Sequence, residues 1–464
     1  MKYYLFLFAI LINQFASATH NKGGYISFQH ISGTTYEITV TMYTDGDAIA
    51  NHRKEIEIKW GDNTSADSIV VDTETIVATN SSLLKRVYVE KHTYPGAGNY
   101  FVSVEDPNKV AGINNISNSV NAPTYLETLL RISPLSDDEN NSVEVLSPLC
   151  VRAEIGRTLR YNLSAFNDDM DVLFYELVPT KGAGGHTARD YVSPNGIKLD
   201  IINGELSWEP TEAGLFAVTV KISECRKDVI VSSTLVDLLI EVYPGPNSSS
   251  LMFLGTVNLE KDGEGRFISY ALPGDSLELD ISLVDQNSLP DMELLKGNED
   301  ASFKLISTNS TTVNKRFEWI PDSTDLSCTP HLFTFRGINN QNLMQDISLL
   351  IYVADTNLMN CDSLCGPNII SIPEYGLNKS KLELVVSPNP FSIQTQVNIL
   401  SEQQYKGAQL KLYNSNGKLI RIIEPQASNE FVVQRGELKS GIYFFSIEGN
   451  TVRYGSGKLI LLDN

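Results

Sequence analysis

Short runs in which apolar and polar residues alternate recur along nearly the whole chain of 464 residues. Residues 36–43, 55–60 and 215–222 are three such runs, and turn residues such as glycine, aspartate or asparagine separate them. A period of two places one face of a strand on a core and the other in water. Helical periodicity is scarce, with residues 126–131 as one short candidate. The pattern therefore predicts an all-β chain of tandem β-sandwich domains.

The first 18 residues have the layout of a secretory signal peptide. Lys2 supplies a positive start, an apolar run extends from Tyr3 to Ile12, and small residues follow before position 19. This run is shorter than the roughly 20 residues that span a bilayer. We therefore expect cleavage between Ala18 and Thr19, and no transmembrane segment in the exported chain.

Acidic residues outnumber basic ones, 56 to 36, which gives a formal net charge of −20. Binding to nucleic acid or anionic lipid needs clustered lysine and arginine, so this balance disfavours both. The acidic excess is spread along the chain without an acidic tail. We interpret it as a solubilising surface charge and expect no nucleic-acid partner.

Two motifs characterise the first unit. Trp60 precedes a Gly-Asp-Asn turn, and the segment from His92 to Tyr100 has the form H-x-Y-x-x-x-x-x-Y with Gly98 inside it. The pair resembles polycystic-kidney-disease (PKD) domains, which are immunoglobulin-like sandwiches, although Gly61 here follows Trp60 directly. The opening residues 18–25 are similar to gliding-motility-associated surface proteins of Bacteroidetes. The resemblance implies a PKD-like sandwich over residues 19–137.

The next two units read as an internal repeat. A glycine-led strand after Gly156 aligns with one after Gly274, and a W-x-P motif at Trp208 aligns with one at Trp319, roughly 110 residues later. This layout resembles the cadherin-like immunoglobulin repeats of bacterial surface proteins, and implies sandwiches over 138–244 and 245–358. We expect both tryptophans to be buried between sheets; the alternative is an exposed ring that grips a sugar.

An acidic turn and five cysteines carry the remaining predictions for these units. Cadherin-like relatives use such a turn for Ca²⁺, so the resemblance makes Asp168, Asp169 and Asp171 a candidate calcium site; the alternative is a solvated turn whose side chains cap the backbone. The cysteines would enter an oxidising compartment, and their odd number leaves at least one unpaired. A disulfide between Cys150 and Cys225 is the pairing we favour, although spacing alone does not fix it.

The last unit, residues 381–464, follows a turn-rich linker over 359–380 and carries four ordered motifs. They are a P-N-P turn, a hairpin with an Asn-Gly turn, an L-x-x-G-x-Y element and a basic residue that opens the last apolar strand. This order resembles the type A C-terminal sorting domain of type IX secretion. The residues that match are Pro388, Asn389, Pro390, Gly417, Gly441, Tyr443 and Lys458. The resemblance implies recognition by an outer-membrane translocon, then removal by a sortase-like peptidase that leaves the chain released or attached to the surface.

Motifs of catalysis are missing from the sequence. It contains no H-E-x-x-H, G-x-S-x-G or P-loop pattern, and its six histidines are scattered. We expect a non-enzymatic secreted or surface protein that adheres to or recognises a glycan or protein, without a certain cofactor. Two alternatives stay open: a secreted hydrolase with accessory β domains, whose catalytic residues are distant in sequence, and a surface-lattice component.

Overall fold

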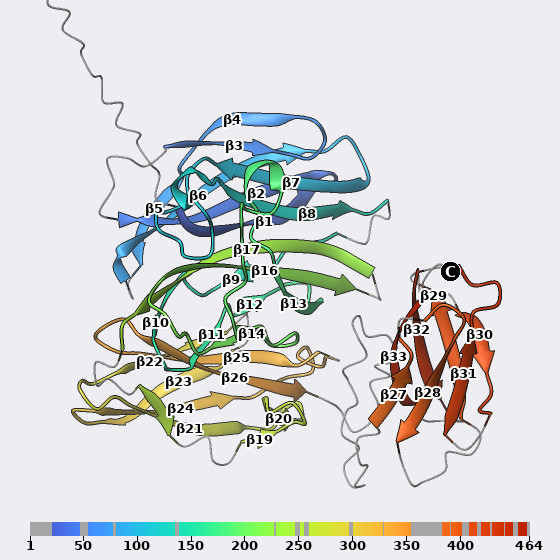
Figure 1. Ribbon diagram of the computed structural model, residues 1–464. Coiled ribbons are helices and arrows are strands. Elements are labelled where there is room, and N and C mark those ends of the chain that lie inside the picture. Colours follow the sequence, from blue (N-terminus) through green and yellow to red (C-terminus); the bar gives the residue numbers. More distant parts are fainter. Residues whose placement is uncertain are drawn as a thin grey trace, which may run out of the picture. The chain divides into compact units, whose positions relative to one another are not determined.

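The computed structural model describes residues 21–46, 54–77, 80–134, 139–226, 229–245, 251–254, 259–296, 300–327, 329–353, 383–389, 391–400, 408–414, 419–426, 429–439, 441–448 and 453–461. Regular structure in these residues is β-strand, apart from two 3-10 turns at Ser119–Asn121 and Ala183–Gly185. The predicted all-β class is therefore confirmed (Figure 1). None of the described helical segments has the length and apolarity of a membrane span. The chain divides into two compact units, residues 1–366 and 367–464.

The first sandwich of the larger unit has strands in the orders β4-β3-β7-β8 and β1-β2-β6-β5. Side chains from both sets form one core that includes Ile38, Trp60, Val102 and Leu126. The strands are β1 (Asn21–Ser32), β2 (Thr35–Asp45), β3 (Glu55–Lys59), β4 (Ser65–Val70), β5 (Thr73–Val77), β6 (Asn80–Thr93), β7 (Gly98–Asp106) and β8 (Thr124–Ile132).

The short helix considered for residues 126–131 is wrong, because these residues belong to β8. Leu126, Thr128 and Leu130 are fully buried, whereas the residues between them are more exposed. This is the two-residue period of a strand that pairs antiparallel with β7 along its whole length. The apolar content of the segment suggested a helix, but the period of burial is that of a sheet.

The second sandwich packs the larger strands β10, β13, β16 and β17 over two small sheets, with the orders β11-β15-β14 and β12-β9. One core cluster spans them and includes Val151, Tyr161, Trp208 and Val236. The strands are β9 (Glu144–Val145), β10 (Cys150–Glu154), β11 (Leu159–Asn162), β12 (Ala165–Phe166), β13 (Val172–Val178), β14 (Lys198–Leu199), β15 (Glu205–Trp208), β16 (Gly214–Arg226) and β17 (Val229–Tyr243).

Strand β17 joins the first two sandwiches into one sheet of 12 strands. One edge of β17 pairs with β16. Its other edge pairs in succession with β8 at residues 232–234, with β1 at Asp237 and with β10 at residues 239–243. The predicted boundary at 137/138 lies in the undescribed residues 135–138. The first and second sandwiches are therefore not separate, because strands of both pair with β17 in one sheet.

The third sandwich has two sheets, in the orders β18-β21-β24-β23 and β19-β20-β26-β25-β22. Its core is rich in aromatic rings, with Phe317, Phe333 and Phe335 fully buried. The strands are β18 (Met252–Leu254), β19 (Glu260–Lys261), β20 (Phe267–Ala271), β21 (Leu277–Val284), β22 (Asp291–Leu295), β23 (Ser302–Thr308), β24 (Thr312–Trp319), β25 (His331–Ile338) and β26 (Met344–Val353).

The structure confirms the repeat between the second and third sandwiches. Leu159 pairs with Trp208 as Leu277 pairs with Trp319. The glycine that leads each strand, Gly156 or Gly274, has a positive φ, and its N–H donates to the carbonyl of the proline in the W-x-P motif, at 2.9 and 2.7 Å. Both tryptophans are at most 4% exposed, so they belong to the cores and neither grips a sugar.

The terminal unit is a smaller sandwich of two sheets, with the orders β27-β28-β31 and β30-β29-β32-β33. Apolar side chains from both sheets, among them Val397, Leu410, Phe431 and Phe445, close its core. The strands are β27 (Glu383–Ser387), β28 (Gln394–Leu400), β29 (Gln409–Asn414), β30 (Leu419–Ile423), β31 (Glu430–Gln434), β32 (Gly441–Glu448) and β33 (Arg453–Leu461).

Candidate functional site

The P-N-P turn lies directly after β27. Pro388 and Asn389 are exposed, and Pro390 lies outside the described residues. Phe391, which follows, is only 3% exposed and forms a parallel bridge with Leu461 at the end of the last strand. Because proline donates no backbone hydrogen bond, the turn ends β27 and directs the chain into the core through Phe391.

The L-x-x-G-x-Y element leads into β32. Gly441 begins this strand and pairs with Leu461, so the element also lies against the last strand. The Tyr443 ring packs against the core, and its hydroxyl donates to the carbonyl of Lys439 at 2.7 Å. The tyrosine thus closes the turn that precedes its own strand.

The basic residue and the hairpin of the sorting motifs both belong to the sheet β30-β29-β32-β33. Lys458 is in β33 and pairs with Phe444 of β32. The predicted hairpin is present, because β29 and β30 pair antiparallel; its turn, which includes Gly417, lies outside the described residues. The hairpin, Gly441, Tyr443 and Lys458 thus belong to this sheet, whereas the P-N-P turn follows β27 of the other sheet.

An exposed apolar strip, Leu419, Ile422 and Phe444, runs across this sheet and was not singled out from the sequence. These side chains are 43%, 50% and 46% exposed. Tyr413 of β29 pairs with Leu419 on one side and with Phe444 on the other. A signal was present, since β30 is apolar at four of its five positions and cannot bury both faces.

The two motifs of the first sandwich form a buried aromatic cluster. The Trp60 and His92 rings stack with centroids 4.7 Å apart, and His92 Nε2 lies 2.8 Å from Asp62 Oδ2. Burial raises the pKa of Asp62, but hydrogen bonds from Thr64 and His92 outweigh it and hold the pKa below its usual value. The Tyr100 hydroxyl donates to Gly96 at 2.9 Å. This cluster therefore stabilises the core of the first sandwich.

An arginine side chain forms ion pairs with the acidic turn at residues 168–171. Arg226 donates from Nε and Nη2 to the two carboxylate oxygens of Asp171, at 2.7 and 2.8 Å, and lies 3.1 Å from Asp169. Asp169 also accepts hydrogen bonds from the backbone and side chain of Asn141. The guanidinium thus stands where the calcium hypothesis placed the cation. Among the described residues, no group of three or more His, Cys, Asp or Glu side chains is arranged to hold a metal ion.

The predicted Cys150–Cys225 disulfide is wrong. Cys150 is free and buried, whereas Cys225 is disulfide-bonded, so the two do not pair. Cys150 lies opposite Leu239 of β17 and Cys225 opposite Ile230, so the two are roughly 30 Å apart at about 3.3 Å per residue. Burial raises the pKa of the Cys150 thiol to about 11, which keeps it unreactive.

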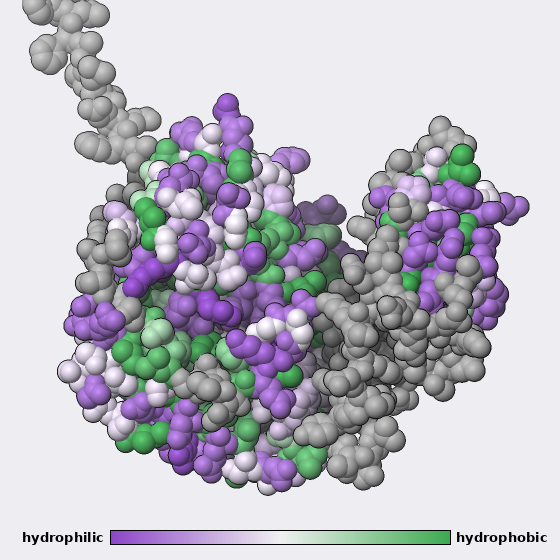
Figure 2. Space-filling view, turned by 60° about the horizontal axis from the view of Figure 1, so that its bottom comes forward, coloured by the Kyte–Doolittle hydropathy of each residue, from purple (hydrophilic) through white to green (hydrophobic). Residues whose placement is uncertain are grey.

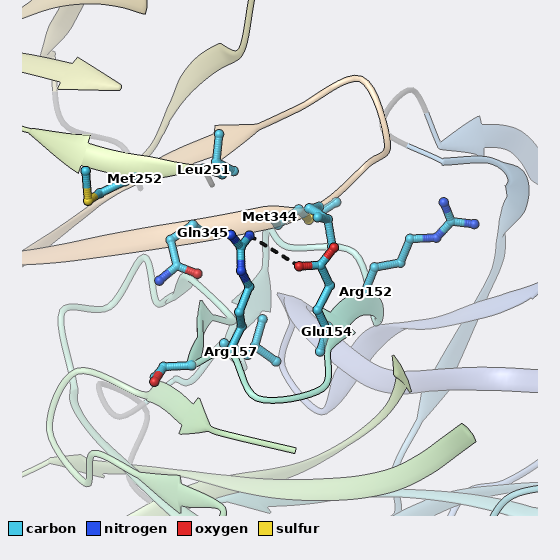
Figure 3. A pocket seen from close by; sticks show the side chains of 11 residues that line it. Arg152, Glu154, Arg157, Leu251, Met252, Met344 and Gln345 are labelled. Carbon is cyan, nitrogen blue, oxygen red and sulfur yellow. Dashed lines mark ion pairs between the residues drawn. The ribbon is translucent and has the colours of Figure 1, made fainter. Parts of the chain in front are cut away.

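A pocket of about 260 Å³ opens where the second and third sandwiches meet (Figure 3). Glu154 and Arg157 face each other in it, with Arg157 Nη1 3.2 Å from Glu154 Oε2. Gln345 lies beside them, and Leu251 and Met252 line the opposite side. The pocket thus presents a cation, an anion and an amide above apolar surface.

A buried ion pair holds the two walls of this pocket together. Arg336 and Asp346 are fully buried, with Nη2 2.7 Å from Oδ2. Asp346 also accepts from the backbone N–H of Asn162 at 2.8 Å, and Arg336 donates to the Asn162 carbonyl at 3.0 Å. These contacts link β11 of one sandwich to β26 of the other beside the pocket.

Solved structures similar to this chain are found at low sequence identity. Similar solved structures include Sidekick-1 immunoglobulin domains 1–4, at 10% identity over 95% of this chain and 99% of that one, with a TM-score of 0.17. The four N-terminal immunoglobulin domains of Dscam1 match at 9% identity over 96% and 100%, with a TM-score of 0.20. A Bacteroides ovatus protein of a mixed-linkage glucan utilization locus, SGBP-B, matches at 12% identity over 70% and 71%, with a TM-score of 0.15. The tandem immunoglobulin-like class itself rests on the strand pairing above.

The terminal unit is then identified by its family. Residues 385–461 match the family of secretion system C-terminal sorting domains, which confirms the prediction from the P-N-P, hairpin and L-x-x-G-x-Y motifs. The chain therefore carries a type IX sorting domain, interacts with that secretion machinery, and is exported to the cell surface or secreted. No curated protein matches the chain. The signal peptide over residues 1–18 lies outside the described residues and stays a prediction.

Proposed function

We propose that the exported chain is a non-enzymatic adhesion or recognition protein, and that the pocket at Glu154 and Arg157 holds its ligand. The observation that carries this proposal is the pocket itself, with its paired charges between two joined sandwiches. A guanidinium, a carboxylate and an amide side by side supply both donors and acceptors. Such a set suits the hydroxyl groups of a glycan, while Leu251 and Met252 can pack on the apolar face of a sugar ring.

Several buried carboxylates of the larger unit serve structure. Glu224 is fully buried and accepts hydrogen bonds from the Val143 N–H at 3.0 Å and from Ser232 and Asn167. Asp346 likewise accepts hydrogen bonds from the Arg336 side chain and from the Asn162 backbone N–H. Groups engaged on every side are poor general acids or bases, which supports a role outside catalysis.

The surface of the larger unit fits a protein that stays in water. Figure 2 shows hydrophobic residues in small groups among hydrophilic ones on the face it presents. Small, separated apolar groups are ordinary for a soluble surface. Recognition is therefore better assigned to a polar pocket than to a broad apolar contact.

A glycan array probed with the full mature chain tests this function. We expect binding to a subset of glycans, with a loss of at least tenfold in affinity for Arg157→Ala, because the ligand loses a charged donor. Arg189→Ala is the matched control, since the Arg189 side chain is 82% exposed and outside the pocket. Equal binding by both variants would sink the pocket assignment, and hydrolysis of an array glycan would favour the hydrolase.

We further propose that a sortase-like peptidase removes the sorting domain after export. The exposed Pro388 and Asn389 follow the first strand of the domain that must be detached, and the linker predicted over 359–380 precedes that domain. Mass spectrometry of the surface protein should find an N-terminus at Thr19 and a C-terminus before residue 381. Recovery of surface protein that still ends at Asn464 would contradict removal.

A further inference from the structure

Lys109 and Asp237 form a buried ion pair at the joint between the first two sandwiches. Lys109 lies in the turn that follows β7, and Asp237 lies in the middle of β17, 128 residues later. Lys109 is 3% exposed and Asp237 is 4% exposed. Lys109 Nζ contacts Asp237 Oδ2 directly. An amine and a carboxyl are thus held against each other with almost no access to water.

The backbone fixes both partners. The Lys109 N–H donates to the Ala122 carbonyl at 2.9 Å, and the N–H of the next residue, Val110, donates to the Asn21 carbonyl at 3.0 Å. Asp237 pairs with Gly24 of β1, and a side chain on neighbouring Gly23 would overlap the Asp237 carbonyl. The close approach of β1 to β17 therefore depends on glycine.

Hydroxyl groups extend from Asp237 toward the surface. Thr219 Oγ1 donates to Asp237 Oδ1 at 3.1 Å, and it lies 2.9 Å from Thr180 Oγ1. The hydroxyl of Tyr191, a half-buried residue, hydrogen-bonds to Thr180 in turn. This chain places a donor on the carboxyl oxygen that Lys109 does not contact, and it offers a route for protons.

We propose that Lys109 and Asp237 condense into an isopeptide bond that cross-links the two sandwiches. A buried pair of opposite charges carries a desolvation cost, and a neutral amide removes both charges. In the reaction, the Lys109 ammonium group first passes one proton to Asp237 Oδ2, and the neutral Nζ then attacks Cγ and forms the N–C bond. The bond from Cγ to Oδ2 breaks, and Oδ2 leaves as water with two protons from the ammonium group. The amide keeps Oδ1 and one N–H, so atoms and charges balance without another reagent.

The Thr219 hydroxyl is placed to assist this step. When nitrogen attacks Cγ, negative charge gathers on Oδ1, where Thr219 donates its hydrogen bond. Thr219 touches the reacting group and thus acts as the stabilising donor. The product would tie the turn after β7 to the central strand of the shared sheet, so that pulling on one sandwich cannot peel it from the other.

The intact mass of the full mature chain, after reduction and alkylation of cysteines, tests the proposal. We expect a mass about 18 Da below that of the sequence, which is the loss of one water. Tryptic digestion should yield a branched peptide that contains both Lys109 and Asp237. The full sequence mass, with the two residues in separate peptides, would show an ion pair only and overturn the cross-link.

Two variants and an internal control sharpen this test. Asp237→Asn keeps the size of the side chain and should close by losing ammonia, for a deficit of about 17 Da. Lys109→Arg keeps the charge but should show no deficit. Lys181 and Glu127, an ion pair at 2.7 Å that is partly open to solvent, should stay unlinked in the same digest. If a variant fails to fold, the mass of the unaltered chain still distinguishes the cross-link from the ion pair.

Discussion

In the larger unit the sandwiches meet across buried charges, whereas the terminal unit is closed by apolar side chains. Lys109–Asp237 and Arg336–Asp346 lie at two successive joints of the larger unit. In the described part of the terminal unit, the buried polar side chains are Thr395 and Ser446, and neither carries a charge. Buried ion pairs fix orientation at a cost in stability, and apolar cores do not need a partner domain. Separating the sandwiches of the larger unit would therefore leave buried charges unpaired, whereas the described core of the terminal unit contains no such charge.

Removing the terminal module should have the largest effect. A chain that lacks residues 381–464 should be lost from the surface and retained in the periplasm, because the sorting domain addresses it to the translocon. Immunoblots of cell fractions measure this. The thermal unfolding of the truncated protein should match that of the larger unit in the full chain. A truncated protein that reaches the surface would contradict the role of the terminal unit in export.

Removing one partner of a buried ion pair in the larger unit should have the next largest effect. Arg336→Leu leaves the Asp346 carboxylate buried without its partner and should cost about 3–5 kcal/mol in the free energy of unfolding. Denaturant unfolding measures the loss, and Arg336→Leu with Asp346→Leu should recover most of it. Arg316→Ala, which breaks an exposed ion pair with Asp280, is the control and should cause no measurable loss. An equal loss in both variants would mean that the joint is not held by burial.

The pH dependence of the larger unit is expected to be smaller for each pH unit. Burial raises the pKa of Glu224 from 4.5 to about 8, with the nearby Asp171 adding to the shift. The folded chain therefore keeps a proton that the unfolded chain releases, so this stabilisation is complete below about pH 4.5 and is lost as the pH rises toward 8. Each pH unit in that window costs up to about 1.4 kcal/mol.

Glu224→Gln should flatten this dependence in denaturant unfolding between about pH 5 and pH 8, since the amide does not titrate. Glu212→Gln, at an exposed position, should leave the slope unchanged. Identical slopes for all three proteins would show that Glu224 is not protonated in the folded chain.

The smallest effect is expected in the terminal unit. Tyr443→Phe removes the hydrogen bond to the Lys439 carbonyl but keeps the ring against the core, and should cost at most about 1 kcal/mol. Tyr443→Ala should cost more, because the packed ring is lost. Equal losses for the two variants would mean that the hydroxyl, and not the ring, secures the turn.

The sequence predicted what local pattern controls. Alternation identified the strands, and the W-x-P motifs at Trp208 and Trp319 identified two sandwiches with the same register. The sorting motifs were recognised because proline, glycine and tyrosine act within a few residues of their own positions. These features are short-range, so a single sequence is enough to read them.

Long-range pairing was not predictable in the same way. The acidic turn was a candidate calcium site with a solvated turn as the alternative, and neither reading included its ion pair with Arg226, which lies 55 residues from Asp171. The Cys150–Cys225 pairing failed because the register of both neighbours on β17 sets their separation. The sharing of β17 between two sandwiches depends on its pairing with β8 at residues 232–234 and with β1 at Asp237, which no local pattern marks.

The central claim is that the terminal unit is an independent export address. A fusion of residues 1–18, a folded reporter and residues 381–464, produced in a cell with type IX secretion, tests it most directly. Protease accessibility on whole cells measures where the reporter lies. The account predicts a reporter that is exposed at the surface or free in the medium, whereas a reporter that stays protected in the periplasm would contradict it.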